Sequence, residues 1–336
     1  MTIDEKLEAY RGGCSFIQYI PNKPAKYGIK IYALVDSKTF YTYNPEIYCG
    51  KQPAGPFQVS NSPSDVVLRL VDGLERSNRN STCDNWYSSC ELRKFLLEKS
   101  ITFIGILKKN KREVPVEFLP NKSRAIGTCL FGFQEDLTLV SYIPKQNTAI
   151  FLISTMHDND SVDVETGKPE IILDYNRIKG GVDTVDQKCN AFSVFRRTKR
   201  WPFATFMAFL NVAEINAYIL YTYGKLNIDM GHQRQSFPKH LLVALMKPHM
   251  QERLLIKSLP LHTWYIFENV LGKPPTRREA DTSLSHRGGY YLCGRSKNNY
   301  TTVKCSNCSQ FSCKNHSRSF VKCDSCINSD RVSESD

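Results

Sequence analysis

Three aspartates stand in contexts that restrict how this chain can fold. Asp36 follows an apolar run, Asp84 follows β-prone residues, and Asp183 follows a Gly-Gly turn and opens a predicted helix. Carboxylates gathered at one edge of a sheet repel one another unless a divalent cation lies between them. Oxygen ligands suit Mg²⁺ or Mn²⁺. Two such ions, about 3.5–4 Å apart, can hold the attacking and leaving oxygens of a phosphodiester. The three contexts therefore predict a metal site in an α/β fold.

The composition predicts a polyanionic partner. The 336 residues carry a formal net charge of +12, and 41% of them are hydrophobic, which is enough for a core. Solvated lysines on an ordinary surface are the simpler explanation of the charge, and nucleic acid is the functional one. The polar first eleven residues do not resemble a secretory signal. The most apolar stretch, residues 203–224, contains Asn and Glu, so we expect a buried helix and no membrane span.

The order of predicted elements favours a mixed α/β layer fold. Alternating and apolar runs predict strands at residues 29–35, 40–43, 80–84 and 102–107, and helical periodicity predicts helices at 62–74 and 86–97. Short strand patterns follow at residues 128–133, 137–142, 149–154 and 170–173. They suggest a β-rich insertion within the α/β domain. Helices are expected again from residue 181, through 201–223, and over about 238–257.

These changes in pattern divide the chain into six predicted segments. Residues 1–107 form the first part of the core, 108–175 the β-rich insertion, and 176–270 the rest of the core with a helical region. A Pro-, Arg-, Ser- and Gly-rich linker covers residues 271–289. A cysteine-rich module at 290–327 and a polar, disordered tail at 328–336 complete the chain.

The cysteine-rich end has the spacing of metal ligands. Twelve cysteines in a chain without a signal sequence indicate reduced thiols and metal rather than disulfides. Pairs separated by two residues let two side chains converge on one tetrahedral ion. A segment this small has little core without metal. We therefore predict structural Zn²⁺ and seven ligands: Cys293, Cys305, Cys308, Cys313, His316, Cys323 and Cys326.

Two tetrahedral zinc sites need eight ligands, so seven leave one site without its fourth ligand. In a cross-braced arrangement, one site uses Cys305, Cys308, Cys323 and Cys326. The other site uses Cys293, Cys313 and His316, with His286 or water as the fourth ligand. Tyr290 stands where a partner cysteine is expected. Consecutive pairing within residues 305–316 is the alternative.

A second acid and a basic stretch follow Asp183. Asp186 lies three residues later on the same helix face, so either acid can bind metal or support the site. Both can equally be acids that stabilise a helix N-terminus. Downstream, Arg196, Arg197, Lys199 and Arg200 form a stretch that can follow a phosphate backbone. Trp201 is expected to pack in the core rather than stack on a base.

Several strings in shared order give the chain a family resemblance. They include Thr82-Cys-Asp-Asn-Trp-Tyr87, Lys179-Gly-Gly-Val-Asp-Thr-Val-Asp-Gln187, residues 19–30, 35–37, 110–115 and 199–202, and the terminal Cys/His run. Across residues 3–327 the chain resembles piggyBac-type transposases and the host proteins derived from them.

This resemblance implies a ribonuclease H-like catalytic core with a β-rich insertion between the second and third acids. It implies a catalytic triad of Asp36, Asp84 and Asp183, with Asp186 in support, that uses Mg²⁺ or Mn²⁺. The family cuts double-stranded DNA at transposon ends through a hairpin intermediate and integrates at TTAA sites. Its cysteine-rich module binds terminal repeats. A nuclear location follows from this activity.

Two departures from the family qualify the expected activity. Family transposases carry a substantial N-terminal region that helps bind DNA and dimerise, and here about a dozen residues precede the first shared strand. We therefore expect a truncated or derived member that works as a homodimer or with a full-length relative. The second departure is Tyr290. The rival hypothesis is a non-catalytic DNA-binding protein that uses the zinc module and basic helices, and a third is a product with little activity.

Overall fold

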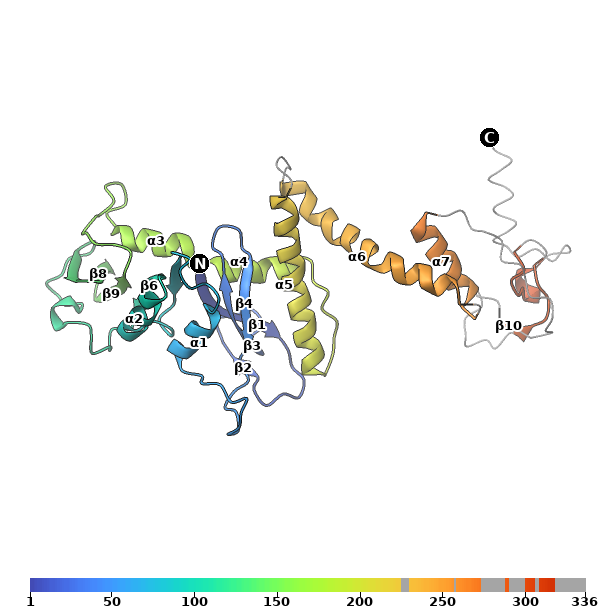
Figure 1. Ribbon diagram of the computed structural model, residues 1–336, viewed down its shortest axis with the longest axis horizontal. Coiled ribbons are helices and arrows are strands. Elements are labelled where there is room, and N and C mark those ends of the chain that lie inside the picture. The colour runs from blue at the N-terminus through green and yellow to red at the C-terminus, as the bar shows by residue number, and fades with distance from the viewer. Residues whose placement is uncertain (225–229, 257, 273–287, 290–299, 306–307, 318–336) are drawn as a thin grey trace. The chain divides into compact units, whose positions relative to one another are not determined.

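The computed structural model describes residues 1–224, 230–256, 258–272, 288–289, 300–305 and 308–317 (Figure 1). The chain divides into two compact units, Met1–Gln235 and Ser236–Asp336. The first unit is a mixed α/β fold built on one sheet. The predicted linker at 271–289 and the tail at 328–336 lie largely outside the described residues.

One nine-stranded sheet organises the described part of the first unit. Its neighbouring strands follow the order β2-β3-β1-β5-β6-β9-β8-β7, and β4 also pairs with β3. β1 is antiparallel to β3 and parallel to β5, and β5 is parallel to β6. The strands are β1 Thr2–Ala9, β2 Gln18–Tyr19, β3 Tyr27–Val35, β4 Thr42–Ile47, β5 Asn80–Cys83, β6 Thr102–Leu107, β7 Cys129–Gln134, β8 Leu137–Lys145 and β9 Thr148–Ser154.

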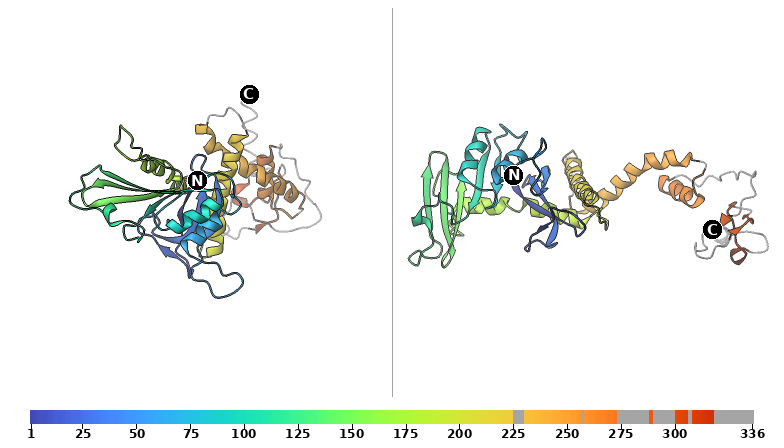
Figure 2. Two further views of the ribbon diagram at one scale, coloured as in Figure 1. Left: turned by 60° about the vertical axis from the view of Figure 1, so that its left-hand side comes forward. Right: turned by 90° about the horizontal axis from the view of Figure 1, so that it is seen from below.

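Helices cover both faces of this sheet (Figure 2). α1 (Pro63–Leu70) and α2 (Cys90–Glu98) pack on one face, where Ile3, Leu34 and Phe103 are buried. Ser62 and Ser89 cap these two helices by accepting backbone N–H bonds. α4 (Gly181–Ala191) and α5 (Trp201–Tyr223) cover Ala33 and Val35 on the opposite face, and α3 (Glu170–Ile178) covers β6, β8 and β9.

Three strands of the predicted insertion lengthen the central sheet. β9 is antiparallel to β6, and β8 and β7 continue outward from it. A short 3₁₀ helix, η1 (Val116–Phe118), precedes them. The residues predicted as a fourth strand, 170–173, instead begin α3. Ile171, Ile172 and Tyr175 bury one helical face, and Pro169 stands directly before the helix, where proline is tolerated.

The first strand, β1, was not predicted from the sequence. Only Ile3 and Leu7 give it an apolar signal, and its other face carries Thr2, Asp4, Lys6 and Glu8. Lys6 and Glu8 are buried, and their charges are paired: Lys6 contacts Glu8 on the same strand and Asp186 on α4. β1 lies at the centre of the sheet between β3 and β5, so its side chains are well placed to join groups from both halves of the unit.

The long apolar helix α5 is part of the core of the first unit. Among the described helices it is the one long and apolar enough to cross a membrane by length and composition, and half of that window is buried inside the unit. Its polar residues bind protein backbone. Asn216 exchanges hydrogen bonds with the backbone N–H and carbonyl of Thr42, and Asn211 accepts from the N–H of Val194. These contacts fit the predicted buried helix.

The second unit contains most of one long helix, a shorter helix and short strand segments. α6 (Met230–Leu254) begins at the end of the first unit, and α7 (Leu261–Leu271) follows. β10 (Gly288–Gly289) pairs with β11 (Tyr300–Thr301), and η3 (Lys314–His316) is a single 3₁₀ turn.

Candidate active site

Three carboxylates line one small pocket at the centre of the sheet. Asp4 from β1, Asp84 directly after β5, and Asp183 from α4 surround a cavity of about 140 Å³. β1 and β5 are parallel and pair Thr2 with Thr82 and Ile3 with Cys83. Continuing that register brings Asp4 beside Asp84. Side chains alternate along strands, so both carboxylates project to the face that α4 covers.

A close approach between α4 and β1 positions the third acid. A Cβ atom on Gly181 would lie 2.3 Å from Thr2 Cγ2, so only glycine allows the helix to start this near the strand. The Thr2 hydroxyl donates a hydrogen bond to the Lys179 carbonyl at 3.3 Å. Asp183 follows in the first turn of α4. A carboxylate is favoured there by the helix dipole.

The pocket holds excess negative charge. Burial, together with the neighbouring carboxylates of Glu5 and Asp183, raises the pKa of Asp4 to about 7. The Glu5 backbone N–H donates to Asp4 Oδ1 at 2.8 Å and opposes this increase. Among the described residues, neither Asp4 nor Asp84 has a cationic group within ion-pair distance. The site is therefore short of positive charge.

The donor set suits a hard divalent cation. All three acids offer oxygen ligands, which Mg²⁺ and Mn²⁺ prefer. The Lys23 ammonium lies 2.8 Å from Asp183 and already places one positive charge at the pocket. Within the described ranges, no three His, Cys, Asp or Glu side chains are drawn together closely enough to form a metal site. Metal binding at these acids therefore requires their side chains to draw closer.

Asp186 lies outside this pocket. Its carboxylate accepts from Lys6 Nζ at 2.8 Å, and Lys6 also contacts Glu8 at 2.8 Å. Burial alone would lower the pKa of Lys6, but the Glu8 and Asp186 carboxylates raise it above the usual range. Asp186 therefore neutralises a buried lysine and joins α4 to β1.

Asp36, the predicted first acid of the triad, does not line the pocket of Asp84 and Asp183. It follows β3 and borders two different cavities. The backbone N–H of Thr39 donates to Asp36 at 2.9 Å, and the Thr39 hydroxyl also donates to it. Burial alone would raise the pKa of Asp36, but these hydrogen bonds lower it. Asp4, and not Asp36, lines the pocket with Asp84 and Asp183, because β1 rather than β3 pairs with β5.

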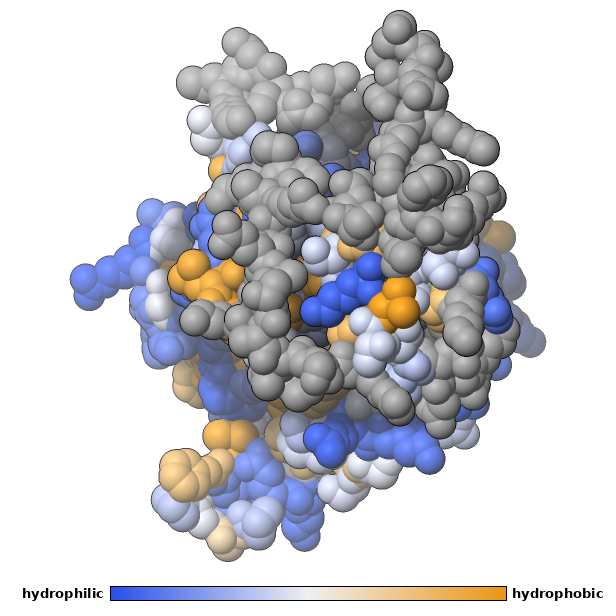
Figure 3. Space-filling model, turned by 90° about the vertical axis from the view of Figure 1, so that its right-hand side faces the viewer, coloured by the Kyte–Doolittle hydropathy of each residue, from blue (hydrophilic) through white to orange (hydrophobic). Residues whose placement is uncertain are grey.

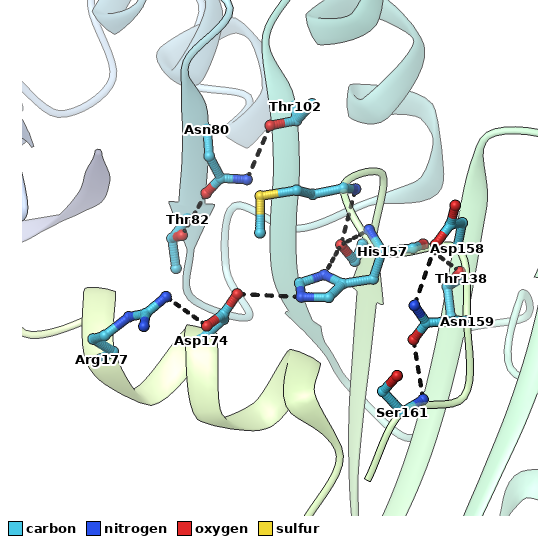
Figure 4. Close-up of polar contacts among 12 residues, drawn as sticks. Asn80, Thr82, Thr102, Thr138, His157, Asp158, Asn159, Ser161, Asp174 and Arg177 are labelled. Carbon is cyan, nitrogen blue, oxygen red and sulfur yellow. Dashed lines mark hydrogen bonds and ion pairs between the residues drawn. The ribbon is translucent and has the colours of Figure 1, made fainter. Parts of the chain in front are cut away.

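Polar contacts join α3 to the turn that follows β9 (Figure 4). His157, after β9, contacts Ser154 Oγ through Nδ1 at 2.8 Å and Asp174 Oδ2 through Nε2 at 3.2 Å. Arg177 donates to the other oxygen of Asp174 at 2.7 Å. The same helix carries Tyr175, which lines the acidic pocket. Burial raises the pKa of Tyr175, and the nearby Asp84 and Asp4 carboxylates raise it further.

The predicted DNA-binding residues lie in a loop between α4 and α5. Arg196, Arg197, Lys199 and Arg200 are all exposed. The sequence predicts that these residues lie on a basic helix, but the helix starts only at Trp201, with proline in its first turn. The Tyr10 hydroxyl donates to the Lys199 carbonyl, so the backbone is held while the charged side chains face outward. Trp201 packs edge-on against Phe16 with ring centroids 5.0 Å apart, as predicted for a core residue.

The cysteine-rich end is described in part. Cys305 and Cys313 are buried, and Cys313 Sγ lies 3.0 Å from His316 Nδ1. The Cys305 backbone N–H donates to the Gln310 carbonyl at 2.7 Å. Cys308 is also among the described residues, whereas Cys293, Cys323 and Cys326 lie outside them. The zinc sites therefore stay a prediction.

The surface in Figure 3 combines hydrophilic and hydrophobic residues. On that face, the described hydrophobic residues form small patches separated by hydrophilic ones. Such a mixture is ordinary for a protein surface. The more specific surface feature is the exposed basic loop described above.

Comparisons with known proteins identify the class. A family model described as Transposase IS4 matches residues 1–218, which include all three acids of the pocket. A cryo-EM structure titled as a piggyBac transposase synaptic complex with hairpin DNA is 34% identical in sequence, with a TM-score of 0.73. That match covers 96% of this chain and 68% of the other. The chain belongs to the IS4-like transposase family and, within it, is of the piggyBac type.

Proposed function

We propose that this protein cleaves and joins DNA phosphodiesters with divalent metal ions held by Asp4, Asp84 and Asp183. The observation that carries the proposal is the meeting of these acids at one pocket, from two parallel strands and one helix start. Their shortage of counter-charge and their oxygen-only chemistry support metal binding. The transposase family and the DNA complex of the relative support DNA as the substrate.

The chain's own residues supply distinct parts of this chemistry. Bound Mg²⁺ or Mn²⁺ would activate the attacking oxygen and stabilise the leaving oxygen. The three acids hold the charge that binds such ions, and the buried ring of Tyr175 forms one wall of the pocket. Lys179 lines the same pocket and brings a positive charge toward a bound phosphate. The exposed loop with Arg196 and Arg197 neutralises the DNA backbone.

Finer parts of the proposal rest on the resemblance and on topology. The antiparallel strands β4, β3 and β1, continued by the parallel strands β5 and β6, support a ribonuclease H-like core. We propose TTAA as the target sequence, the nucleus as the location, and a homodimer or a complex with a full-length relative as the working assembly.

A hairpin-opening assay tests the proposed function. Wild-type protein should nick a labelled DNA hairpin that carries TTAA flanks in Mg²⁺ but not in EDTA. Asp84→Asn should abolish nicking and leave duplex binding intact, because amide oxygen is a weaker ligand than carboxylate. Asp163→Asn, at an exposed turn, is the matched control and should nick normally. Wild-type protein that binds DNA but nicks no substrate under any divalent ion would support the rival, a non-catalytic DNA-binding protein.

The zinc module has its own test. The hydrogen bond from the Cys305 N–H to the Gln310 carbonyl and the closeness of Cys313 to His316 support metal ligation at this end. Native mass spectrometry should find two zinc ions per chain. The site with Cys293, Cys313 and His316 should lose its ion to a chelator first, and Tyr290→Cys should slow that loss. One zinc ion, unchanged by the substitution, would contradict the two-site arrangement.

A further inference from the structure

Two adjoining cavities flank Asp36 on the first unit. One has a volume of about 650 Å³ and the other about 370 Å³, and Met1, Asp36 and Arg79 line both. Thr2, the next residue along β1, lines the acidic pocket. The two cavities therefore lie beside the acids along the same strand, although the mechanism above does not use them.

The smaller cavity is aromatic and apolar. Its walls include Tyr41, Tyr43, Leu74, Ile219, Leu220 and Tyr223. Tyr43 is 43% exposed and Tyr223 is 68% exposed, so both rings present area to a ligand. The Tyr43 hydroxyl donates to the Asp72 carbonyl at 3.3 Å, which holds that ring in place. Flat, partly fixed aromatic surfaces of this kind suit stacking by a planar group.

The larger cavity carries cationic groups. Lys38, Arg79 and Arg177 line it, together with Asp36 and Asp174. Asp174 is already paired with Arg177, and Asp36 is held by Thr39. In the described part of the chain, Arg79 and Lys38 form no ion pair within 4 Å. Two cations are thus left to bind an anion beside the aromatic walls.

We propose that these cavities bind one unstacked nucleotide of single-stranded DNA. The base stacks on Tyr43 and Tyr223, and its phosphate binds Arg79 and Lys38. A nucleotide is the ligand that combines a planar π-face with an adjacent anion, and stacking with backbone neutralisation is how proteins hold single strands. The proposal rests on DNA as the substrate, and it adds a site for a base displaced from the duplex near the point of cleavage.

Binding without metal tests the base site separately from catalysis. Fluorescence anisotropy in EDTA would compare a labelled single-stranded oligodeoxynucleotide with the same strand made abasic at its central positions. Wild-type protein should bind the base-containing strand roughly 5- to 100-fold more tightly, as expected for base–aromatic stacking. Tyr223→Ala and Tyr43→Ala should lose most of that preference, and Tyr223→Phe should keep it.

Matched variants complete the test. Tyr19→Ala removes a tyrosine that is 57% exposed on β2, away from the cavities, and should keep the preference. Arg79→Ala should weaken both strands and reduce the slope of log affinity against log salt by about one. Equal binding of the two strands by wild-type protein, or an equal loss in Tyr19→Ala and Tyr223→Ala, would overturn the proposal. Asp84→Asn should keep the base preference, so failure of cleavage and failure of this site give different results.

Discussion

Two groups of carboxylates on the same strand and helix have opposite surroundings. Asp186 on α4 and Glu8 on β1 both contact the buried ammonium of Lys6 at 2.8 Å. One helical turn away, Asp183 meets Asp4 and Asp84, and only Asp183 has a cation, Lys23, within ion-pair distance. In the first group every carboxylate is paired with Lys6, and these contacts help to hold α4 on β1. The second group keeps unpaired charge, which destabilises the empty protein and is available to a ligand.

The largest expected difference between the groups is in catalysis. Asp183→Asn should reduce Mg²⁺-dependent nicking by about a thousandfold or more, because charge held at a metal contributes several kcal/mol to the transition state. Asp186→Asn should retain far more activity, since the amide oxygen can still accept from Lys6. Rates of hairpin opening by the two purified variants check this. Equal losses would show that both acids serve the same site.

For stability the expected order is reversed, because the Asp186 variant should lose more free energy of unfolding than the Asp183 variant. Asp186→Ala leaves buried Lys6 paired with Glu8 alone and should cost about 1–3 kcal/mol, less than the cost of a buried charge with no partner. Asp183→Ala removes an acid whose side chain is 59% exposed, so its free energy of unfolding should change by less than about 1 kcal/mol. Urea unfolding of metal-free protein measures both values. A larger loss in Asp183→Ala would mean that its pair with Lys23 holds the fold.

The close contact between Gly181 of α4 and Thr2 of β1 can be broken and restored. Gly181→Ala places a methyl against Thr2 Cγ2 and should cost about 1–3 kcal/mol, as overpacking does. Nicking should fall as well, because Asp183 moves with the helix start. Adding Thr2→Ser removes the opposing methyl and keeps the hydroxyl that bonds Lys179. The double variant should regain stability and activity, and no recovery would contradict this packing account.

The acids of the pocket, Asp4 above all, should also make the stability of the metal-free protein depend on pH. The pKa of Asp4 is raised from its ordinary 3.8 to about 7, so between these values the folded state binds a proton that the unfolded state has released. The free energy of unfolding should therefore fall as pH rises through this window. Asp4→Asn should flatten the profile and raise stability at pH 8 by roughly 1–2 kcal/mol. An unchanged profile would show that Asp4 is not the source.

The elements that were predicted correctly are those whose structure is decided by local sequence pattern. The strand at 102–107, the strands near 129–154, and the helix after Gly180-Gly181 each carry their own periodicity or turn. The family and two members of the acidic pocket, Asp84 and Asp183, were also predicted from the sequence.

The elements that were missed are those whose structure depends on a partner far along the chain. β1 has a polar sequence, and its Lys6 can be buried because Asp186 on α4 pairs with it, a contact that no local pattern predicts. Without β1, the acid after the apolar strand β3 was the natural first choice, and Asp4 was missed. The signal available was the string Thr2-Ile-Asp4-Glu-Lys-Leu7, in which Ile3 and Leu7 are the apolar residues. Strand order in the sheet, which the chain sequence does not state, decides between the two aspartates.

Cleavage by two aspartate variants tests the central claim most directly. The claim is that Asp4, not Asp36, completes the site of Asp84 and Asp183. Hairpin opening in Mg²⁺ would be measured for Asp4→Asn and Asp36→Asn, after circular dichroism has confirmed that both are folded. The account predicts at least about a thousandfold loss for Asp4→Asn and a loss within about tenfold for Asp36→Asn. Near-normal cleavage by Asp4→Asn, with cleavage abolished in Asp36→Asn, would contradict it.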